Sequence, residues 1–281
     1  MIWKTASRTL DLARPLVMGI LNVTPDSFSD GGRYDSVAAA LAHAEQMIAD
    51  GADMIDIGGE STRPGSTQVC ADLEIERVIP VIEHLSRRVD VAISIDTTKA
   101  AVAEAAIAAG AEIINDISGL RWDPAVADVS ARTGAALILM HSRGTFESMH
   151  SQERVRDIVS EVTAGLKGSI NTAKQHGVSD DRIAIDVGIG FSKSFEQNLE
   201  LLAKLDEIAN IFTSYPMIVG TSRKSFIGRV LGDLPVDQRV SGSVASSVMA
   251  AQKGARIIRV HDVKETVNAL AILEAVERPA L

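Results

Sequence analysis

The chain has 281 residues, of which 46% are hydrophobic and 23% charged, with a formal net charge of −9. The acidic balance disfavours a protein that coats nucleic acid, and the single cysteine, Cys70, excludes a disulfide framework and suits a cytoplasmic location. Without an 18-residue apolar run or an N-terminal apolar h-region, we expect neither a membrane span nor a secretory signal.

Short β-branched runs alternate with longer amphipathic stretches along the chain. The runs are nearly continuous apolar segments, as expected for parallel strands that are buried on both faces. We predict eight strands: Val17–Asn22, Met54–Gly58, Ala92–Asp96, Ile113–Ile117, Ala136–Met140, Ile183–Asp186, Met217–Gly220 and Arg256–Val260.

The stretches between these strands repeat apolar residues at three- and four-residue spacing, which is typical of helices that cover a sheet. We predict helices at Val37–Ala49, Leu73–Ser86, Ala100–Ala109, Pro124–Arg132, Val155–His176, Phe195–Ile208, Ser243–Lys253 and Val263–Val276.

The order of these elements predicts an α/β fold, a (β/α)8 barrel that forms one domain over residues 1–281. An open, doubly wound sheet has the same alternation, but a count of eight units favours the closed barrel. The loops that follow the strands are long and rich in Asn, Asp, Thr, Arg, Lys and His. In a barrel these loops build the active site.

Acidic side chains end three of the predicted strands: Asp96, Asp116 and Asp186, with Asn115 beside the second. Any one of them can be explained as a helix N-cap or as a solvated strand end. Several together favour a polar pocket, because carboxylates there accept paired hydrogen bonds from a flat ring rich in N–H groups.

Basic side chains follow the second, seventh and eighth predicted strands. Phosphate or pyrophosphate is their natural ligand, because the last two loops are the usual phosphate site of such barrels and a helix starts near Lys224. A set of solvated surface charges is the alternative. The group comprises Arg63, Arg223, Lys224, Arg259 and His261, with hydroxyls from Ser222 and Ser225.

Three single residues allow more than one interpretation. The amide oxygen of Asn22 fits a Mg²⁺ site, and Asn22 equally fits a turn before Thr24-Pro25. Lys224 has the chemistry of a Schiff-base lysine as well as of an anion binder. His141 fits a hydrogen-bonded wall residue better than a ligand. The chain contains no complete dinucleotide fingerprint, Walker A motif or HExxH zinc motif.

Long ordered segments between Met18 and Val263 resemble the dihydropteroate synthase family of folate biosynthesis. They are MGILNVTPDSFSDGG, GGESTRPGS, SIDTTK, INDISG, LMH, GTSRKSFIG, RVSGSVA and GARIIRVHDV. The resemblance implies a transferase on a pterin-binding barrel. It joins 6-hydroxymethyl-7,8-dihydropterin diphosphate to p-aminobenzoate and releases 7,8-dihydropteroate and pyrophosphate.

The same resemblance assigns roles by position. The pterin ring would be held by Asp96, Asn115, Asp186 and Lys224, with Asp96, Asp186 and Lys224 as the catalytic residues. Further substrate-binding positions are Thr62, Arg63, Ser225, Arg259, Val260 and His261, of which Thr62, Arg63, Arg259 and His261 would handle the diphosphate. The p-aminobenzoate would be bordered by Phe28, Thr62, Pro64 and Ser225, and Asn22 would bind Mg²⁺.

The family likeness also implies two mobile loops, about Thr24–Asp35 and Glu60–Gln68, inhibition by sulfonamides, and a homodimer that packs helices near the C-terminus. The apolar faces of Val244–Ala251 and Leu270–Val276 suit that interface. Two alternatives stay open. One is another enzyme, a pterin-dependent methyltransferase, and the other is a catalytically silent paralogue that binds pterin or another protein.

The chain departs from the family pattern at four positions. After the sixth strand it reads DVGIGFSK where the family usually has DPGFGFGK, so Val187, Ile189 and Ser192 differ. Phe146 stands where the family usually has proline. Because Asp186 and Gly190 remain, we expect these changes to affect the shape of the pocket more than its chemistry.

Overall fold

Eight parallel strands close into a barrel in the computed structural model, which describes residues 1–24 and 33–277. Around the ring the order is β10-β3-β4-β5-β6-β7-β8-β9, so every neighbouring pair along the chain is also a neighbouring pair in space. The strands are β3 Leu16–Asn22, β4 Met54–Gly58, β5 Ala92–Asp96, β6 Ile113–Asp116, β7 Ala136–Met140, β8 Ile183–Asp186, β9 Met217–Val219 and β10 Ala255–Val260.

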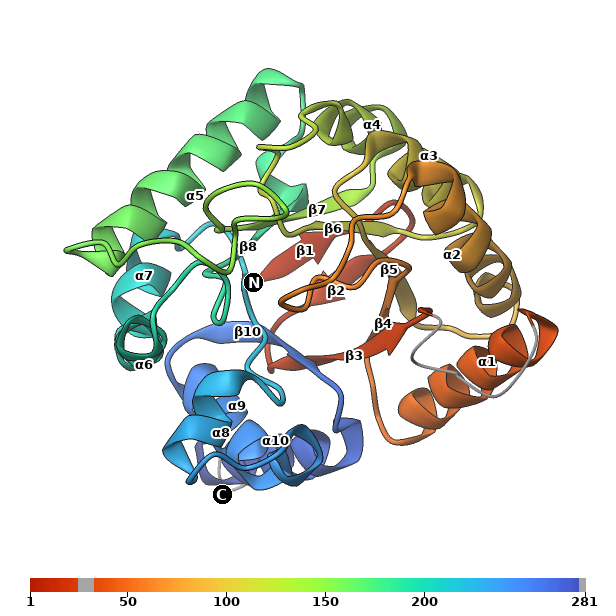
Figure 1. Cartoon of the computed structure of the whole chain (residues 1–281). Coiled ribbons are helices and arrows are strands. Elements are labelled where there is room, and N and C mark those ends of the chain that lie inside the picture. The colour runs from red at the N-terminus through yellow and green to blue at the C-terminus, as the bar shows by residue number, and fades with distance from the viewer. Residues whose placement is uncertain (25–32, 278–281) are drawn as a thin grey trace.

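Helices surround the barrel on its outside (Figure 1). The predicted helix at Phe195–Ile208 is in fact two helices that meet at Lys204, and a short helix follows the seventh barrel strand where the sequence indicated one. The helices are α1 Arg33–Ala49, α2 Ala71–Ser86, α3 Ala100–Ala108, α4 Ala125–Thr133, α5 Ile158–Gln175, α6 Phe195–Ala203, α7 Leu205–Ile211, α8 Ser225–Val230, α9 Val240–Gln252 and α10 Val263–Glu277.

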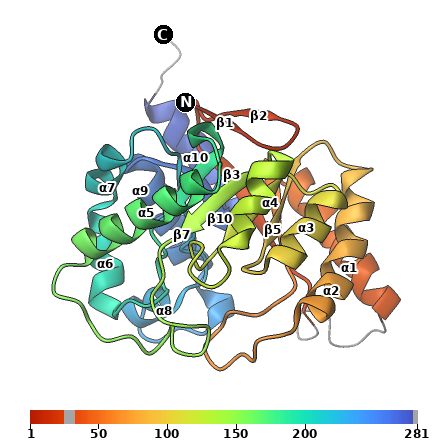
Figure 2. The same ribbon diagram turned by 90° about the horizontal axis from the view of Figure 1, so that it is seen from above.

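An N-terminal hairpin, which the sequence analysis did not predict, lies across the end of the barrel where the strands begin (Figure 2). Strands β1 (Ile2–Lys4) and β2 (Thr9–Asp11) pair antiparallel. They carry the fully buried Trp3 onto the interior residues Met18 and Met54, and the indole nitrogen of Trp3 donates to the Arg182 carbonyl at 3.0 Å. The hairpin therefore closes the base of the barrel.

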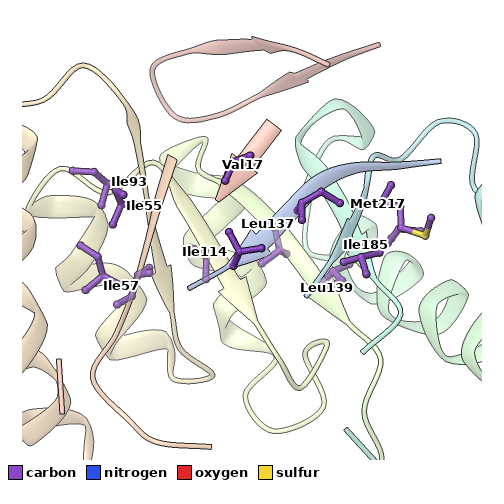
Figure 3. Packing of buried hydrophobic residues seen from close by; sticks show 14 of the residues in the cluster. Val17, Ile55, Ile57, Ile93, Ile114, Leu137, Leu139, Ile185 and Met217 are labelled. Carbon is purple, nitrogen blue, oxygen red and sulfur yellow. The ribbon is translucent and has the colours of Figure 1, made fainter. Parts of the chain in front are cut away.

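Strand alternation separates two apolar cores. Side chains that point outward, including Ile55, Ile57, Ile93 and Leu137, pack against the helices in the larger core (Figure 3). Side chains that point inward near the base form a smaller core with Trp3. Because successive side chains of a strand face opposite sides, the next inward positions toward the carboxyl end are those that build the site described below.

Local sequence chemistry fixes the loop between β8 and α6 at that carboxyl end. Helix α6 starts with a capping box: Gln197 N–H donates to the Ser194 hydroxyl at 3.2 Å, and Ser194 N–H donates to the Gln197 side chain at 3.1 Å. The amide oxygen of Asn198 accepts from Gly190 N at 2.6 Å. The glycine-rich segment 187–193 is thus tied to the first turn of the helix that follows it.

Candidate active site

Acidic and basic side chains meet inside the barrel near the carboxyl ends of the strands. Arg259 lies at the centre: its Nε is 2.6 Å from Asp56 Oδ2, and its Nη2 is 2.7 Å from Asp96 Oδ2. The amide of Asn115 donates to the same Asp56 oxygen at 3.0 Å. The expectation that Asp96 and Arg259 share one rim of the barrel is confirmed.

Asp56 is a residue of this cluster that the sequence analysis missed. It is fully buried in the middle of β4, and its second carboxylate oxygen has no hydrogen-bond partner among the described residues. The sequence does contain a sign of its role: Asp56 is a single carboxylate between two isoleucines, in a strand that is buried on both faces. An ionised group there needs a charged partner, because desolvation penalises a charge that has none.

Burial shifts the pKa values of the site toward neutrality. Burial raises the pKa of Asp96 to about 7, although the Arg259 charge opposes the shift, and the nearby Asp56 adds to it. Burial raises the pKa of Asp186 as well, against the neighbouring Lys224. The same desolvation lowers the pKa of Lys224 to about 8, with Asp186 opposing. Such shifts cluster where groups are held for chemistry.

Lys224 reaches this cluster from the loop between β9 and α8. Its ammonium donates to the Ile189 carbonyl and lies 4.9 Å from the centre of the Phe191 ring. Gly190 leaves the room for it, because a Cβ at that position would sit 2.8 Å from Lys224 Cδ, and the backbone there has a φ of +85°. Asp186, Lys224 and Arg259 therefore come from β8, the loop after β9 and β10, which are neighbouring strands, and their charges act on one another.

Two other predicted site groups have structural roles instead. The Asp116 carboxylate points outward and accepts from the backbone N–H groups of Ser118 and Leu120, each at 2.7 Å, so it fixes a turn. Arg223 does not join the anion-binding group, because its guanidinium pairs with Asp262 and its Nε lies 3.1 Å from that carboxylate.

His141 is a wall residue, as the sequence suggested. It is buried beside α5, and burial lowers its pKa to about 2, so the ring is neutral. Its Nδ1 accepts from the buried ammonium of Lys193 at 3.0 Å. Lys193 Nζ also donates to the carbonyls of His141 and Phe191, each at 2.9 Å, and so joins the loops after β7 and β8.

The loop between β4 and α2 carries Thr62, Arg63 and Pro64 on an open stretch, where Arg63 and Pro64 are exposed. His150 connects this loop to the cluster: its Nε2 lies 2.7 Å from the Thr62 carbonyl, and its ring lies 5.8 Å from that of Phe191. Phe28, assigned to the same region by resemblance, lies outside the described residues.

The end of β10 contributes less charge than the sequence analysis expected. His261 lies 3.1 Å from the Ser222 hydroxyl, and burial, together with the Arg259 charge, lowers its pKa to about 3, so it is uncharged. The Val260 side chain is buried in the outer core, so only its backbone faces the loops. Ser225 is exposed at the first turn of α8.

Asn22 ends β3 on the inner face of the barrel, close to Asp96. A Cβ at Gly58 would lie 3.8 Å from Asn22 Oδ1 and 3.9 Å from Asp96 Oδ2, so the missing side chain leaves a space bordered by two hard oxygen atoms. That donor set fits a cation such as Mg²⁺, which keeps several waters and phosphate oxygens. No cluster of three His, Cys, Asp or Glu suited to a metal occurs in residues 1–24 and 33–277.

The four departures from the family pattern are accommodated by packing and by two hydrogen bonds of Ser192. Val187 and Ile189 are fully buried in the outer core, and Phe146 packs edge-on against Trp122 at 6.0 Å. Ser192 has a φ of +57°, and its hydroxyl accepts from Arg143 N at 2.8 Å and donates to Arg143 O at 3.0 Å. The side chain thus joins two loops at a position with strained backbone.

This arrangement suits a ligand that is a flat heterocycle with an anionic tail. Asp96 and Asp186 offer acceptors to ring N–H groups, and low local dielectric strengthens such bonds. The exposed Arg63 follows β4, and Lys224 follows β9, so both lie in loops at the carboxyl end of the barrel, where basic groups suit an anionic tail. Among the described residues, no helix is long and apolar enough to cross a membrane.

Comparison with known proteins agrees with this geometry. The chain matches the family model described as "Pterin binding enzyme" over residues 18–261. It is 47% identical over 262 residues to a dihydropteroate synthase of Bacillus subtilis (strain 168), covering 93% of this chain and 88% of that protein.

Solved structures give the same result. The chain is similar to Xanthomonas albilineans dihydropteroate synthase with 4-aminobenzoic acid, with a TM-score of 0.92 and 45% identity, over 100% of this chain and 98% of that one. It is also similar to the Yersinia pestis dihydropteroate synthase in a sulfonamide drug complex, with a TM-score of 0.92 and 46% identity, over 99% of each chain.

Proposed function

Because the chain belongs to the pterin-binding enzyme family, we propose that it is a transferase catalysing the dihydropteroate synthase reaction. It joins 6-hydroxymethyl-7,8-dihydropterin diphosphate to p-aminobenzoate and forms 7,8-dihydropteroate and pyrophosphate. The observation that carries the proposal is the Asp56–Arg259–Asp96 cluster with Asp186 and Lys224 at the carboxyl end of the barrel.

The pterin ring binds among Asp96, Asn115, Asp186 and Lys224. Carboxylates accept from the N–H and amino groups of the ring, while the Lys224 ammonium and the Asn115 amide donate to its acceptors. Arg259 is already paired with Asp56 and Asp96, so it contributes positive charge and orients Asp96. A preorganised set of this kind lowers the barrier because it needs no rearrangement during the reaction.

Bond cleavage precedes bond formation in the proposed mechanism. The C–O bond to the diphosphate breaks, and its electron pair leaves with pyrophosphate. The methylene carbon that remains is cationic, and the buried carboxylates of Asp96 and Asp186 stabilise it. The arylamine nitrogen of p-aminobenzoate then attacks this carbon and loses a proton to solvent. No covalent enzyme intermediate is required.

The leaving group is handled by Thr62, Arg63, Arg259 and His261. Arg63 is exposed and suited to bidentate contact with phosphate. His261 is neutral, so it donates a hydrogen bond rather than a charge. Bound Mg²⁺ would neutralise charge on the diphosphate. Asn22 is the residue that would hold it, with waters and phosphate oxygens as the other ligands.

The second substrate binds in a pocket bordered by Thr62, Pro64 and Ser225, which the family resemblance assigns by position. The same position would accept sulfonamides, whose arylamine resembles that of p-aminobenzoate. Phe28 is assigned to this pocket by resemblance alone, because it lies outside the described residues.

We further propose that residues 1–281 form one domain, that the enzyme is cytoplasmic and that it is a homodimer. The lone exposed Cys70 suits a reducing compartment. Exposed apolar side chains on α8, α9 and α10, including Val230, Met249, Ile272 and Val276, suit an interface between two copies. Sedimentation should give twice the chain mass, and Ile272→Glu should shift it toward the monomer.

A coupled pyrophosphate assay tests the function. The chain is mixed with dihydropterin diphosphate, p-aminobenzoate and Mg²⁺, and each component is omitted in turn. We expect pyrophosphate release that needs all three, and loss of it in Asp186→Asn but not in the surface variant Glu104→Gln. Methyl transfer from methyltetrahydrofolate to a corrinoid protein, without pyrophosphate release, would support the alternative enzyme. Borohydride trapping of a carbonyl substrate on Lys224 would indicate Schiff-base chemistry instead.

A further inference from the structure

The loop between β4 and α2 has a closed neck. Its residues 60–69, here called the anion loop, carry Thr62, Arg63 and Pro64. At one end of the loop, the Glu60 carboxylate accepts from Val69 N at the other end, at 2.6 Å. Inside the loop the hydroxyls of Ser61 and Ser66 lie 2.8 Å apart. The ends are thus joined by one side chain, as in compact surface loops.

A half-buried lysine joins this neck to the barrel. Lys99 Nζ lies 3.0 Å from Glu60 Oε1 and 2.6 Å from Glu74 Oε2. The three side chains come from the anion loop, the first turn of α2 and the loop after β5. Lys99 is three residues beyond Asp96, so the neck is joined to the same strand that carries an acid of the ring site.

The neck is largely shielded from solvent. The exposed fractions of the side chains are 1% for Glu74, 8% for Glu60 and 17% for Lys99. Burial raises the pKa of Glu74 despite its bond to Lys99, and one Glu74 oxygen has no partner among the described residues. Burial alone would lower the pKa of Lys99, but its bonds to Glu74 and Glu60 raise it instead.

Such a group adds little to the stability of the fold. Desolvating three charges costs about as much as their attraction returns, and apolar replacements of buried ion pairs are often neutral or stabilising. What a buried ion group can supply is a fixed geometry. A further contact fixes the backbone next to the neck: the Arg77 guanidinium donates to the Gly59 carbonyl at 2.7 Å.

We propose that Glu60, Lys99 and Glu74 are positioning residues, which fix the two ends of the anion loop to the barrel beside the strand that carries Asp96. The proposal rests on the proposed function for its substrates, a diphosphate and an arylamine, and on the contacts alone for its geometry. Neither Glu60, Lys99 nor Glu74 needs to touch substrate. They act through Thr62, Arg63 and Pro64, whose placement depends on the neck.

Hydrogen exchange tests the geometry without reference to activity. The double variant Lys99→Met/Glu74→Met removes the Lys99 and Glu74 charges together, so that neither of these two stays buried without the other, and it leaves Glu60 with the Val69 N–H as its remaining contact at the neck. We expect the amides of residues 61–69, Val69 above all, to exchange about tenfold faster or more than in the parent chain, because a lost neck lowers the local opening free energy. The barrel strands should exchange unchanged.

The matched control is Arg132→Met/Glu104→Met, which removes an exposed pair between α4 and α3. This variant should leave exchange in the anion loop unchanged. If the Lys99→Met/Glu74→Met chain were folded and exchanged like the parent across residues 61–69, the positioning role would be refuted. If the double variant does not fold, the single variants Glu60→Gln and Lys99→Arg are compared by the same measurement. We expect faster exchange of the Val69 amide in Glu60→Gln and exchange close to that of the parent in Lys99→Arg. Parent-like exchange in Glu60→Gln would refute the positioning role as well.

Steady-state kinetics then connect the neck to the reaction. We expect Lys99→Met/Glu74→Met to lose about 10- to 100-fold in kcat/KM, the scale for misplaced binding groups, with KM rising for both substrates. Lys99→Arg, which keeps the charge, should recover most of the loss. A lower melting temperature with unchanged KM values would mean a merely structural role. A parent chain without pyrophosphate release would refute the proposed function, while the exchange result would still decide the geometry.

Discussion

The two ends of the barrel interior are built from the same strands but have opposite chemistry. At the base, the inward residues are apolar and close against Trp3 and Leu12 of the N-terminal segment. Two residues further along β4, Met54 gives way to Asp56, and along β10 Ile257 gives way to Arg259. Two residues along a strand, which is one inward position to the next, therefore separate the packed core from the charged site.

This difference divides stability from function. Folding buries the apolar side chains at the base away from water, which stabilises the protein. The carboxyl end holds charges whose desolvation is unfavourable and whose placement is useful for chemistry. Changes at the base should therefore lower stability and spare turnover, while changes at the charged end should do the reverse.

The largest effect is expected at the base. Trp3→Ala should lower the free energy of unfolding by about 3–5 kcal/mol, because a large buried aromatic leaves a cavity. Denaturant titration measures it, and Ile2→Ala, at an exposed neighbour, is the control. Turnover per folded molecule should stay at the parent value. A loss of turnover in fully folded Trp3→Ala would show that the two ends are not separate.

The next effect is at the charged end. Lys224→Ala, Asp186→Asn and Asp96→Asn should each lose about 3 kcal/mol or more of transition-state stabilisation, more than about 100-fold in kcat/KM. The pyrophosphate assay measures it. The exposed variant Lys204→Ala, on the outer surface, should stay near the parent rate. Near-normal turnover in all three site variants would show that these residues do not form the ring site.

A smaller effect is expected from pH. The pKa of Asp96 is about 7 and that of Lys224 about 8. Affinity for the dihydropterin ring should rise as Asp96 ionises and fall as Lys224 loses its proton. Each limb should approach about tenfold per pH unit. Calorimetric titration between pH 5.5 and 9.5 measures this, and Asp96→Asn should lose the acidic limb. An acidic limb that persists in Asp96→Asn would assign it to another group.

The smallest effect is a gain of stability in an inactive variant. The folded-state pKa of Asp96 lies above its ordinary value of 3.8, so the folded protein binds this proton more tightly than the unfolded chain does. Stability from this group is therefore present at low pH and lost as the pH rises toward 7.

Asp96→Asn removes the titrating carboxyl, so stability is no longer lost as the pH rises, and the amide oxygen remains an acceptor for Arg259. Its melting temperature should exceed that of the parent by on the order of 2 °C at pH 8, and the gain should vanish near pH 4. Thermal scans at the two pH values measure it, with the exposed Asp237→Asn as the control. An equal shift at both pH values would argue against the titration of Asp96 as its cause.

Periodicity was enough to predict the barrel. Met54–Gly58, Ala92–Asp96, Ala136–Met140 and Ile183–Asp186 are confirmed with both boundaries, because long apolar runs buried on both faces leave little choice of structure. The N-terminal hairpin was missed because strands of three residues are too short to display a period. The break at Lys204 was missed because the apolar spacing continues across it.

The site was predictable as a group but not residue by residue. Asn115 and Asp116 are adjacent, yet one points into the barrel and the other caps a turn, and only the register of β6 decides between them. Arg223 and Asp56 depend on partners that lie 39 and 203 residues away along the chain, Asp262 and Arg259. No local pattern encodes such pairs.

The seal at the base has a consequence for how the molecule is made. Trp3 is hydrogen-bonded to a carbonyl 179 residues later in the chain, and β3 pairs with β10. During translation Trp3 leaves the ribosome long before Arg182 exists, so the base stays open until β8 has emerged. Until β10 arrives, β3 and β9 are unpaired edges that invite pairing with other nascent chains. The last strand made therefore ends the period in which this chain is most exposed to aggregation.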